Sequence, residues 1–240
     1  MRVIVAENYD ALSEQAADFF AGLIAETPAA NVMPATGNTP MGMYKVLAAR
    51  KASGEIDAGG LKVFQLDEYC GLAQDDYRSL FGWMLRSFIE PLDIPLTNVT
   101  RLPGDAANPA AACASFETRV VEAGGIDIAI LGLGPNGHLG FNEPPTDQNA
   151  PTRLVTLTSE SIVSNGPYWG GDQQVPLQAV TAGMTLLLAA KQIVLVVSGK
   201  NKRNILKQTL NGPVTPDVPS SFLQQAQNVT VITDQDAYRF

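Results

Sequence analysis

Cysteine and histidine are scarce in this chain, and their scarcity excludes several classes of protein. The 240 residues include two cysteines, Cys70 and Cys113, and one histidine, His138. Two cysteines so far apart in the sequence cannot build a disulfide framework or a zinc knuckle. The segment around His138 offers too few further ligands for a metal, so we expect none. A reducing compartment, the cytoplasm, fits this composition best.

Long hydrophobic runs and an excess of positive charge are also missing. No apolar run approaches the roughly 20 residues needed to cross a bilayer, and the N-terminus turns polar at Glu7 and Asn8, unlike a signal peptide. The chain has 16 Lys and Arg against 24 Asp and Glu, a net charge of −8. We therefore expect neither a membrane nor a nucleic acid as a partner. A phosphorylated substrate must be bound locally, by backbone amides and one or two cations.

Apolar residues are plentiful and follow two alternating patterns. Hydrophobic residues make up 45% of the sequence and no boundary is evident, so we expect a single domain over residues 1–240. Short β-branched runs alternate with segments of helical period, which predicts a single-domain α/β fold, a largely parallel sheet with helices on both faces as in Rossmann-like proteins. The expected strands cover residues 3–5, 31–35, 63–66, 126–131, 193–197 and 229–232. The expected helices cover residues 11–24, 41–49, 77–89, 110–121, 177–190 and 202–210, and residues 144–151 and 166–171 are expected to form surface loops or a mobile flap.

A polar segment containing glycine joins the second expected strand to a helix. It reads Thr36-Gly37-Asn38-Thr39-Pro40, with Asn38 or Thr39 suited to capping the helix and Pro40 to its first position. Glycine lets a ligand approach the backbone closely, and the amides of a first helical turn carry partial positive charge. The segment predicts a phosphate-binding loop, with an ordinary capped turn as the alternative.

Two acidic residues follow the third expected strand, in Leu66-Asp67-Glu68-Tyr69. Neighbouring side chains of an extended chain point to opposite faces, so only one acid can enter a cleft at the strand end, and we predict that it is Asp67. A partly desolvated carboxylate can act as a general base toward a carbon acid. The alternative is a solvated turn or a helix cap.

The fourth expected strand ends in a glycine-rich turn that contains the single histidine. His138 follows Asn136 and precedes Glu143, an arrangement that can orient and tune an imidazole for proton transfer. The alternative is a packed or surface histidine without a catalytic role. Each of these three segments follows the carboxyl end of an expected strand, where open α/β sheets bind ligands, so one shared site explains them best. Lys202 lies just past another strand and is a candidate to join that site.

The same segments resemble the glucosamine-6-phosphate deaminase and galactosamine-6-phosphate isomerase family, which is related to 6-phosphogluconolactonases. The similarity covers nearly the whole chain and is carried by MPATGNTP (33–40), FQLDEY (64–69), GPNGH (134–138), FNEP (141–144), VPLQAVTAG (175–183) and residues 229–237. Lactonases typically continue the glycine-histidine turn with Ser-Leu-Phe-Pro in place of FNEP. This difference favours the aminosugar branch.

The resemblance implies an aldose-to-ketose isomerisation joined to loss of ammonia, without an organic cofactor. It implies that His138 moves protons during ring opening, that Asn136 and Glu143 position and tune it, and that Asp67 carries a proton from C2 to C1. The expected substrate is a small-molecule sugar phosphate. Its phosphate is expected to bind Thr36, Gly37, Asn38, Thr39 and Lys202.

Two positions depart from the family pattern. Many members have aspartate where this chain has Asn136, and a neutral amide can hold an imidazole but cannot stabilise its charged form as a carboxylate does. Members commonly carry an arginine for the phosphate in the segment where this chain reads GPYW, residues 166–169. The absence of that bidentate guanidinium implies that another cation replaces it or that the substrate differs.

Several functions therefore stay open. The leading one converts glucosamine 6-phosphate and water to fructose 6-phosphate and ammonia, and a galactosamine-6-phosphate deaminase would use the same proton chemistry. A 6-phosphogluconolactonase would need no base at C2, so it should not depend on Asp67. A non-catalytic sugar-phosphate-binding module fits the missing arginine but not the presence of Asp67, His138 and Glu143 together. A monomer or a small homo-oligomer is expected.

Overall fold

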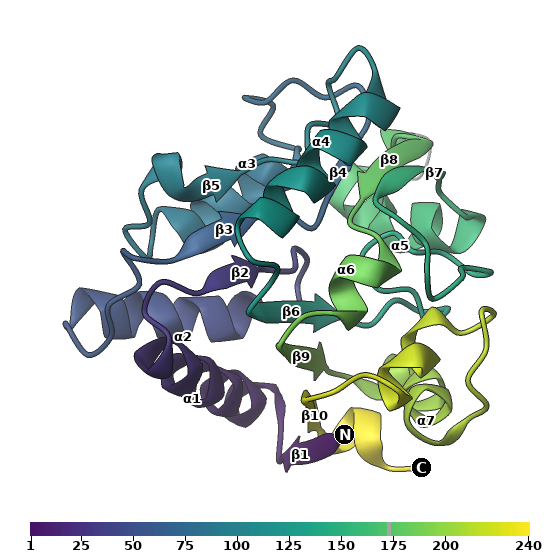
Figure 1. The fold of residues 1–240 in the computed structure, drawn as a ribbon. Coiled ribbons are helices and arrows are strands. Elements are labelled where there is room, and N and C mark those ends of the chain that lie inside the picture. The colour runs from purple at the N-terminus through teal and green to yellow at the C-terminus, as the bar shows by residue number, and fades with distance from the viewer. Residues whose placement is uncertain (172–173) are drawn as a thin grey trace.

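A seven-stranded parallel sheet forms the centre of the fold (Figure 1). The computed structural model describes residues 1–171 and 174–240. The strands lie in the order β1-β10-β9-β6-β2-β3-β5, and all neighbours run parallel. Their bounds are β1 (Arg2–Ala6), β2 (Asn31–Met33), β3 (Lys62–Phe64), β5 (Val99–Thr100), β6 (Ile128–Gly132), β9 (Gln192–Val197) and β10 (Val229–Asp234). The predicted α/β fold with a largely parallel sheet is confirmed.

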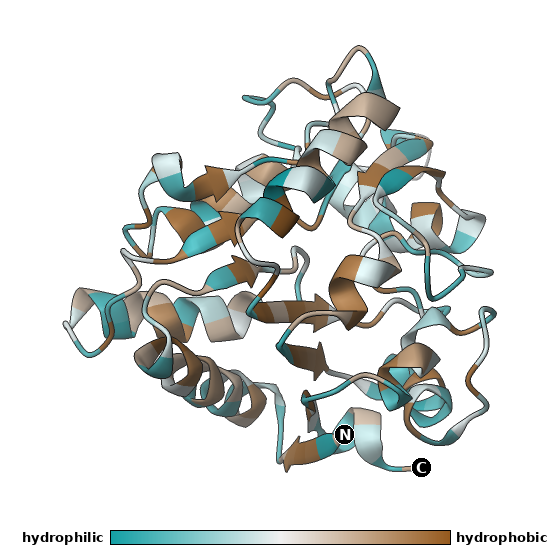
Figure 2. Cartoon of the chain, in the orientation of Figure 1, coloured by the Kyte–Doolittle hydropathy of each residue, from teal (hydrophilic) through white to brown (hydrophobic). Residues whose placement is uncertain are grey.

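Helices cover both faces of this sheet, as predicted. On one face lie α1 (Tyr9–Glu26) and α2 (Met41–Ala52), and on the other α4 (Pro109–Glu122), α6 (Met184–Leu188), α7 (Arg203–Asn211) and α8 (Gln235–Tyr238) (Figure 1). The central strands β6 and β9 are almost entirely apolar, as expected where both faces of a parallel sheet are buried (Figure 2). Side chains of β9 alternate between the two cores, with Val194 and Val196 toward α1 and Leu195 toward α4.

A second, antiparallel sheet packs beside the first and was not predicted. It has the order β4 (Asp67–Tyr69), β8 (Gln178–Thr181), β7 (Arg153–Thr156) and carries α3 (Leu80–Met84) and α5 (Ser159–Trp169). The helix predicted over residues 177–190 is therefore wrong. Its apolar residues belong to two elements, β8 and α6, and the chain turns between them at Gly183, where a side chain would collide with the backbone of residues 150–152.

Two further predictions need correction. Residues 166–169, expected in a surface loop, form the last turn of α5, and Trp169 is buried against Tyr69 with its ring centroid 5.2 Å away. The helix expected over residues 77–89 begins only at Leu80, capped by Ser79, and continues as the π-helical turn η1 (Leu85–Ile89). Residues 144–151 do form a loop, as expected.

The order of the strands places a topological switch point between β2 and β6. From β2 the chain adds β3 and then β5 on one side, and β6 begins the series that adds β9 and β10 on the other. Connections leaving the carboxyl ends of β2 and β6 therefore diverge, which opens a crevice between them. The predicted phosphate loop follows β2 and the histidine turn follows β6, so the fold brings the two segments to one edge.

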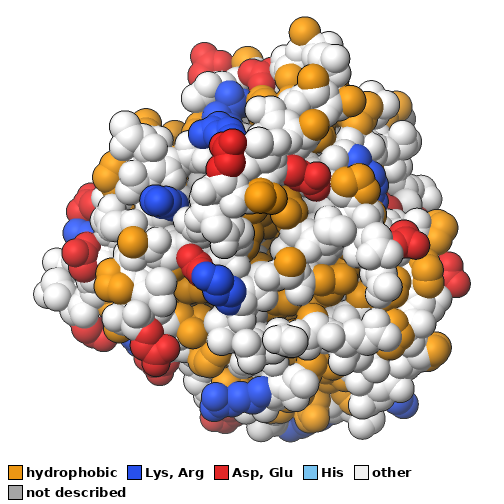
Figure 3. Space-filling model, in the orientation of Figure 1, with side chains coloured by type: hydrophobic (Ala, Val, Ile, Leu, Met, Phe, Trp, Pro, Cys, Tyr) orange, Lys and Arg blue, Asp and Glu red, His pale blue; other side chains and the backbone are white. Residues whose placement is uncertain are grey.

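The surface carries charges of both signs. On the face drawn in Figure 3, acidic and basic side chains are interspersed with apolar ones. Across residues 1–171 and 174–240, no helix is long and apolar enough to cross a membrane.

Candidate active site

A cavity of about 330 Å³ opens at the switch point, within the size range of small-molecule sites. The predicted residues that line it are Thr36, Gly37, Asn38, Thr39, Asp67, His138 and Lys202. Asn136 and Glu143, predicted as catalytic, do not line the cavity but lie behind His138, where they can act only through it. The fold thus brings together predicted residues from four separate parts of the sequence.

The loop after β2 offers unpaired backbone amides to the cavity. Gly37 has φ +106°, a conformation that favours glycine, and among the described residues no hydrogen bond uses the amides of Gly37 or Thr39. The predicted capping is wrong, because α2 begins at Met41 after Pro40, without a side-chain cap. The hydroxyl of Tyr9 in α1 instead accepts a hydrogen bond from the Gly42 amide at 2.9 Å. Tyr9 thereby fixes the position of the loop, a role that only the tertiary structure reveals.

Asp67 enters the cavity and Glu68 does not, as the alternation of side chains predicts. Asp67 is not at the tip of β3, however, but opens β4, paired with Thr181 of β8. The carboxylate of Glu68 points away and accepts hydrogen bonds from the amides of Leu80 and Phe81, each at 2.9 Å. Glu68 thus stabilises the start of α3, and Asp67 is left as the acid of the cavity.

The environment of Asp67 holds its carboxyl group in the neutral form. The residue is buried, and among the described residues its Oδ1 atom has no hydrogen-bond partner. Desolvation, followed by the charge of Glu68, raises the pKa of Asp67 to about 8. A carboxylate with such a pKa is a much stronger base than an ordinary one, and its pKa is close to neutral pH, as general acid-base catalysis favours.

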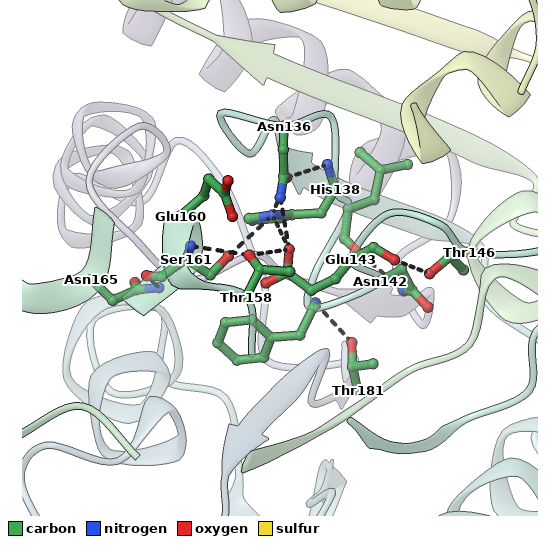
Figure 4. A network of polar contacts seen from close by, with 12 residues as sticks. Asn136, His138, Asn142, Glu143, Thr146, Thr158, Glu160, Ser161, Asn165 and Thr181 are labelled. Carbon is green, nitrogen blue, oxygen red and sulfur yellow. Dashed lines mark hydrogen bonds and ion pairs between the residues drawn. The ribbon is translucent and has the colours of Figure 1, made fainter. Parts of the chain in front are cut away.

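His138 is held from one side by a polar network, drawn in Figure 4. Its Nδ1 lies 2.7 Å from Oδ1 of Asn136 and 3.2 Å from Oε2 of Glu143. The amide nitrogen of Asn136 donates to that same Glu143 oxygen at 2.9 Å, so the Asn136 oxygen must accept from Nδ1–H of His138. This pattern assigns the proton of a neutral imidazole to Nδ1 and leaves Nε2 unprotonated, free to accept a proton from a ligand in the cavity.

Glu143 is the anion of this network. Burial raises the pKa of Glu143. Opposing effects outweigh burial and lower the pKa to about 2: a hydrogen bond and the charge of His138, and further hydrogen bonds from Ser161 and Asn136. Thr158 also donates to Oε2 of Glu143, at 3.2 Å. Glu143 is therefore ionised at neutral pH and can stabilise a positive charge on His138 when the imidazole gains a second proton.

Two glycines let the turn after β6 hold the histidine. A side chain at Gly134 would collide with the His138 ring, and Gly137 has φ +87°, which an ordinary residue rarely adopts. The turn also passes close to the acid, since a Cβ at Gly140 would lie 3.5 Å from Oδ2 of Asp67. The glycines therefore serve close approach as much as flexibility.

Lys202 reaches the cavity from the connection after β9. It ends the short 3-10 helix η4 (Lys200–Lys202), and its Nζ donates to the carbonyl oxygen of Leu133 at 2.7 Å. Desolvation lowers the pKa of Lys202. The connection is fixed by Asp234 in β10, whose carboxylate accepts from the amide of Gly199 at 3.1 Å. Within the described ranges, no group of three or more His, Cys, Asp or Glu side chains is placed to hold a metal ion.

The model of the family described as glucosamine-6-phosphate isomerases/6-phosphogluconolactonase matches residues 6–232 of this chain. The chain belongs to this family. Glucosamine-6-phosphate deaminases of Thermoanaerobacter sp. (strain X514) and Halothermothrix orenii are 40% and 39% identical to it over 237 residues, which is 99% of this chain and 94% and 98% of theirs. A monomeric glucosamine-6-phosphate deaminase of known structure superimposes with a TM-score of 0.96 at 35% identity, covering 99% of this chain and 98% of the other. The 6-phosphogluconolactonase of Leishmania guyanensis, with a TM-score of 0.76 at 21% identity over 98% of this chain and 97% of its own, shares the fold.

Several residues of the cavity were missed by sequence reasoning. Tyr168 and Trp169, at the end of α5, line it. Two cations also line it, Arg78 from the turn before α3 and Arg86 from η1. Burial raises the pKa of the Tyr168 hydroxyl, while a hydrogen bond with the backbone of Asn38 opposes that effect. The two arginines lie in a stretch with no recognisable motif, so only the fold shows that they face the family's site.

Proposed function

We propose that this protein is a glucosamine-6-phosphate deaminase, which converts glucosamine 6-phosphate and water to fructose 6-phosphate and ammonia. The observation that carries the proposal is the pairing of Asp67 with His138 in one cavity, beside a loop with free amides. Family membership and the deaminases at 35–40% identity support it. A protein that only bound a sugar phosphate would not need a desolvated acid and an oriented imidazole.

The phosphate end of the substrate fits the loop of residues 36–39. Its free amides and the ammonium of Lys202 lie at the carboxyl edge of the sheet and supply donors to an anion. This placement extends the sugar from the loop toward Asp67 and His138. Each step that follows is a proton transfer or the addition of water, and neither needs an organic cofactor.

Ring opening is assigned to His138. Its Nε2 accepts the proton of the C1 hydroxyl and returns a proton to the ring oxygen as the bond from C1 to that oxygen breaks. The positive charge that the imidazole carries in between is stabilised by the Glu143 anion and fixed in position by Asn136. Both residues are therefore positioning residues, and His138 is the group that contacts the sugar.

Isomerisation is assigned to Asp67. The ionised carboxylate takes the proton from C2 of the open-chain aldehyde, and the electrons of the C2–H bond form a double bond between C1 and C2 as the carbonyl oxygen takes a proton from water. Asp67 then returns its proton to C1, and the electron pair of the amino nitrogen forms a protonated imine at C2. Water adds to this carbon and ammonia leaves, giving the ketose phosphate and releasing the proton that the carbonyl oxygen took up. The raised pKa of Asp67 suits it to hold the proton between the two steps.

Ammonia release from glucosamine 6-phosphate tests the proposal. The assay is run beside galactosamine 6-phosphate, the unphosphorylated sugars and 6-phosphogluconolactone, with Asp67→Asn as the inactive control. Turnover of glucosamine 6-phosphate that the variant lacks is the expected result. Faster turnover of the galactosamine epimer would change the substrate, and lactone hydrolysis that survives in Asp67→Asn, without ammonia release, would refute the deaminase.

The setting of the enzyme is part of the same proposal. Both cysteines are free thiols, which suits the reducing cytoplasm and the catabolism of aminosugars there. The similarity to a deaminase that is monomeric supports a monomer, with a small homo-oligomer as the alternative.

A further inference from the structure

Three cations line the cavity along its described wall: Lys202, Arg78 and Arg86. Lys202 is tied to the Leu133 carbonyl and is partly desolvated. Arg86 donates from Nη2 to the carbonyl oxygen of Tyr77 at 2.7 Å, which braces the turn that precedes α3. The remaining cation, Arg78, is the one that no role described above explains.

The guanidinium of Arg78 is held rigidly but keeps donors to spare. Its Nε donates to Oδ1 of Asp76 at 3.0 Å and its Nη2 to Oδ2 at 2.7 Å. Its central carbon lies 5.1 Å from the centroid of the Trp169 ring, a cation–π distance. A guanidinium has five N–H groups, and the described contacts of Arg78 use two of them. The unused edge can bind a second anion without any rearrangement of the first pair.

The helix that follows Arg78, α3, contacts the start of α2, which follows the phosphate loop. The indole nitrogen of Trp83 in α3 contacts the sulfur of Met41, the first residue of α2, at 3.2 Å. The Trp83 and Tyr168 rings meet edge to face with centroids 5.2 Å apart. Arg78 lies against Trp169 at the end of α5, and Tyr168 of the same helix makes a hydrogen bond with the backbone of Asn38, so Arg78 and residues 36–39 line one cavity.

We propose that Arg78 binds the substrate phosphate and supplies the guanidinium that residues 166–169 lack. The cation stacks on Trp169, at the end of that very segment, so it reaches the region from a different part of the chain. Asp76 does not cancel this role, because it occupies one edge of the guanidinium and fixes the direction of the other. The side-chain hydrogen bond from Arg78 lowers the pKa of Asp76 to about 2, so the pair persists at the pH of the reaction.

The role of Arg78 rests on the proposed function for its substrate, but phosphate binding can be measured without turnover. Arg78→Gln, Arg78→Lys and Arg86→Gln are compared with wild type, and Arg2→Gln serves as the control. Arg2 begins β1, at the opposite edge of the sheet, and its loss changes the net charge by the same amount. Inorganic phosphate is titrated by calorimetry, and KM for glucosamine 6-phosphate is measured beside inhibition by unphosphorylated glucosamine.

We expect Arg78→Gln to weaken inorganic phosphate and raise KM by about 10- to 100-fold, the scale of a hydrogen bond between charged groups. Unphosphorylated glucosamine should inhibit the variant as it inhibits wild type, since a merely structural loss would affect both sugars. Arg78→Lys should recover part of the affinity, because an ammonium keeps the charge but cannot bind in a bidentate way. Arg2→Gln should bind phosphate as wild type does.

Three results would overturn the role of Arg78. The first is unchanged phosphate affinity in Arg78→Gln, and the second is a loss confined to Arg86→Gln, which would move the role to Arg86. The third is unchanged KM for glucosamine 6-phosphate in Arg78→Gln. A wild type that binds phosphate through Arg78 but releases no ammonia would contradict the proposed function alone. Deamination with unchanged KM in Arg78→Gln would leave the proposed function intact and refute this role.

Discussion

Replacing Asp67 with asparagine tests the proposed proton carrier with little change in shape. We expect turnover to fall by roughly two to four orders of magnitude, the usual contribution of a positioned acid or base. Phosphate affinity should stay near that of wild type, because residues 36–39 and Lys202 lie in other connections. Exchange of the C2 hydrogen with D₂O, followed by NMR, reports the step itself. Wild-type exchange in the variant would refute the assignment.

The same substitution should change the pH dependence of stability, with a sign that follows from burial. Desolvation, and then the charge of Glu68, raises the pKa of Asp67 from an ordinary 3.8 to about 8 in the folded protein. Between these values the folded chain holds a proton that the unfolded chain has lost. The wild type therefore loses stability as pH rises through this window. At 1.36 kcal/mol per pKa unit, the ceiling of this loss is roughly 6 kcal/mol.

Denaturant unfolding of both proteins from about pH 4 to about pH 9 measures this effect. The cost of burying the replacing amide is the same at every pH, so it drops out of the comparison between pH values. The free energy of unfolding of Asp67→Asn, relative to that of wild type, should increase with pH up to about pH 8. Above that pH the difference between the two proteins should stay constant. Wild-type kcat/KM should rise over the same range. A pH-independent difference in stability would show that Asp67 is not held neutral by the fold.

The other residues of the site give four further tests. Asn136→Asp adds an anion beside His138, which favours the protonated imidazole, so the acid limb of the pH–rate profile should move to higher pH. An unchanged profile would show that residue 136 does not affect the titrating group. Glu143→Gln should lower the free energy of unfolding by about 1–3 kcal/mol at pH 7. Because the pKa of Glu143 is lowered to about 2 in the folded protein, this loss should shrink as pH falls below about 4.5, and denaturant unfolding above and below that pH measures it. Gly134→Ala displaces the ring of His138 and should lower kcat about 100-fold. Lys202→Ala should weaken the phosphorylated sugar by roughly 1.5–3 kcal/mol in calorimetry and leave glucosamine unaffected.

The parallel sheet and its helices could be predicted because their signals are local. Residues 193–197 of β9 form an unbroken apolar run, and α1 and α4 carry apolar residues at helical spacing behind the capping residues Asn8 and Asn108. The strands of the second sheet have only three or four residues each. β2 and β3 are equally short, but they lie in the apolar segments 31–35 and 63–66. The strands of the second sheet mix polar and apolar residues, so only tertiary pairing identifies them, and the helix predicted over residues 177–190 failed there.

The residues of the candidate site also differ in whether a local sequence signal identifies them. Asp67, His138 and the loop of residues 36–39 follow apolar strands or lie in glycine-rich turns, so motif and position identify them together. Arg78 can be identified only from the folded structure, in which it lies against Trp169, a residue distant in the sequence. Tyr9 is similar, since its contact with Gly42 joins two helices. Such residues leave no local signal, because their environment is made by segments that are distant in the sequence.

The carboxylates around the cavity explain how an acidic protein can accept an anionic sugar. Glu68 is occupied by the amides that begin α3, Glu143 by Asn136 and His138, and Asp76 by Arg78. Asp67 is the acid that lines the cavity without such partners on Oδ1, within the part of the chain that the structure describes, and its pKa of about 8 keeps it neutral in the free enzyme. The acid that faces the cavity is therefore neutral when the sugar phosphate enters, and it does not add to the repulsion of the phosphate. The substrate brings an amino group to C2, and its protonated form favours an ionised carboxylate nearby.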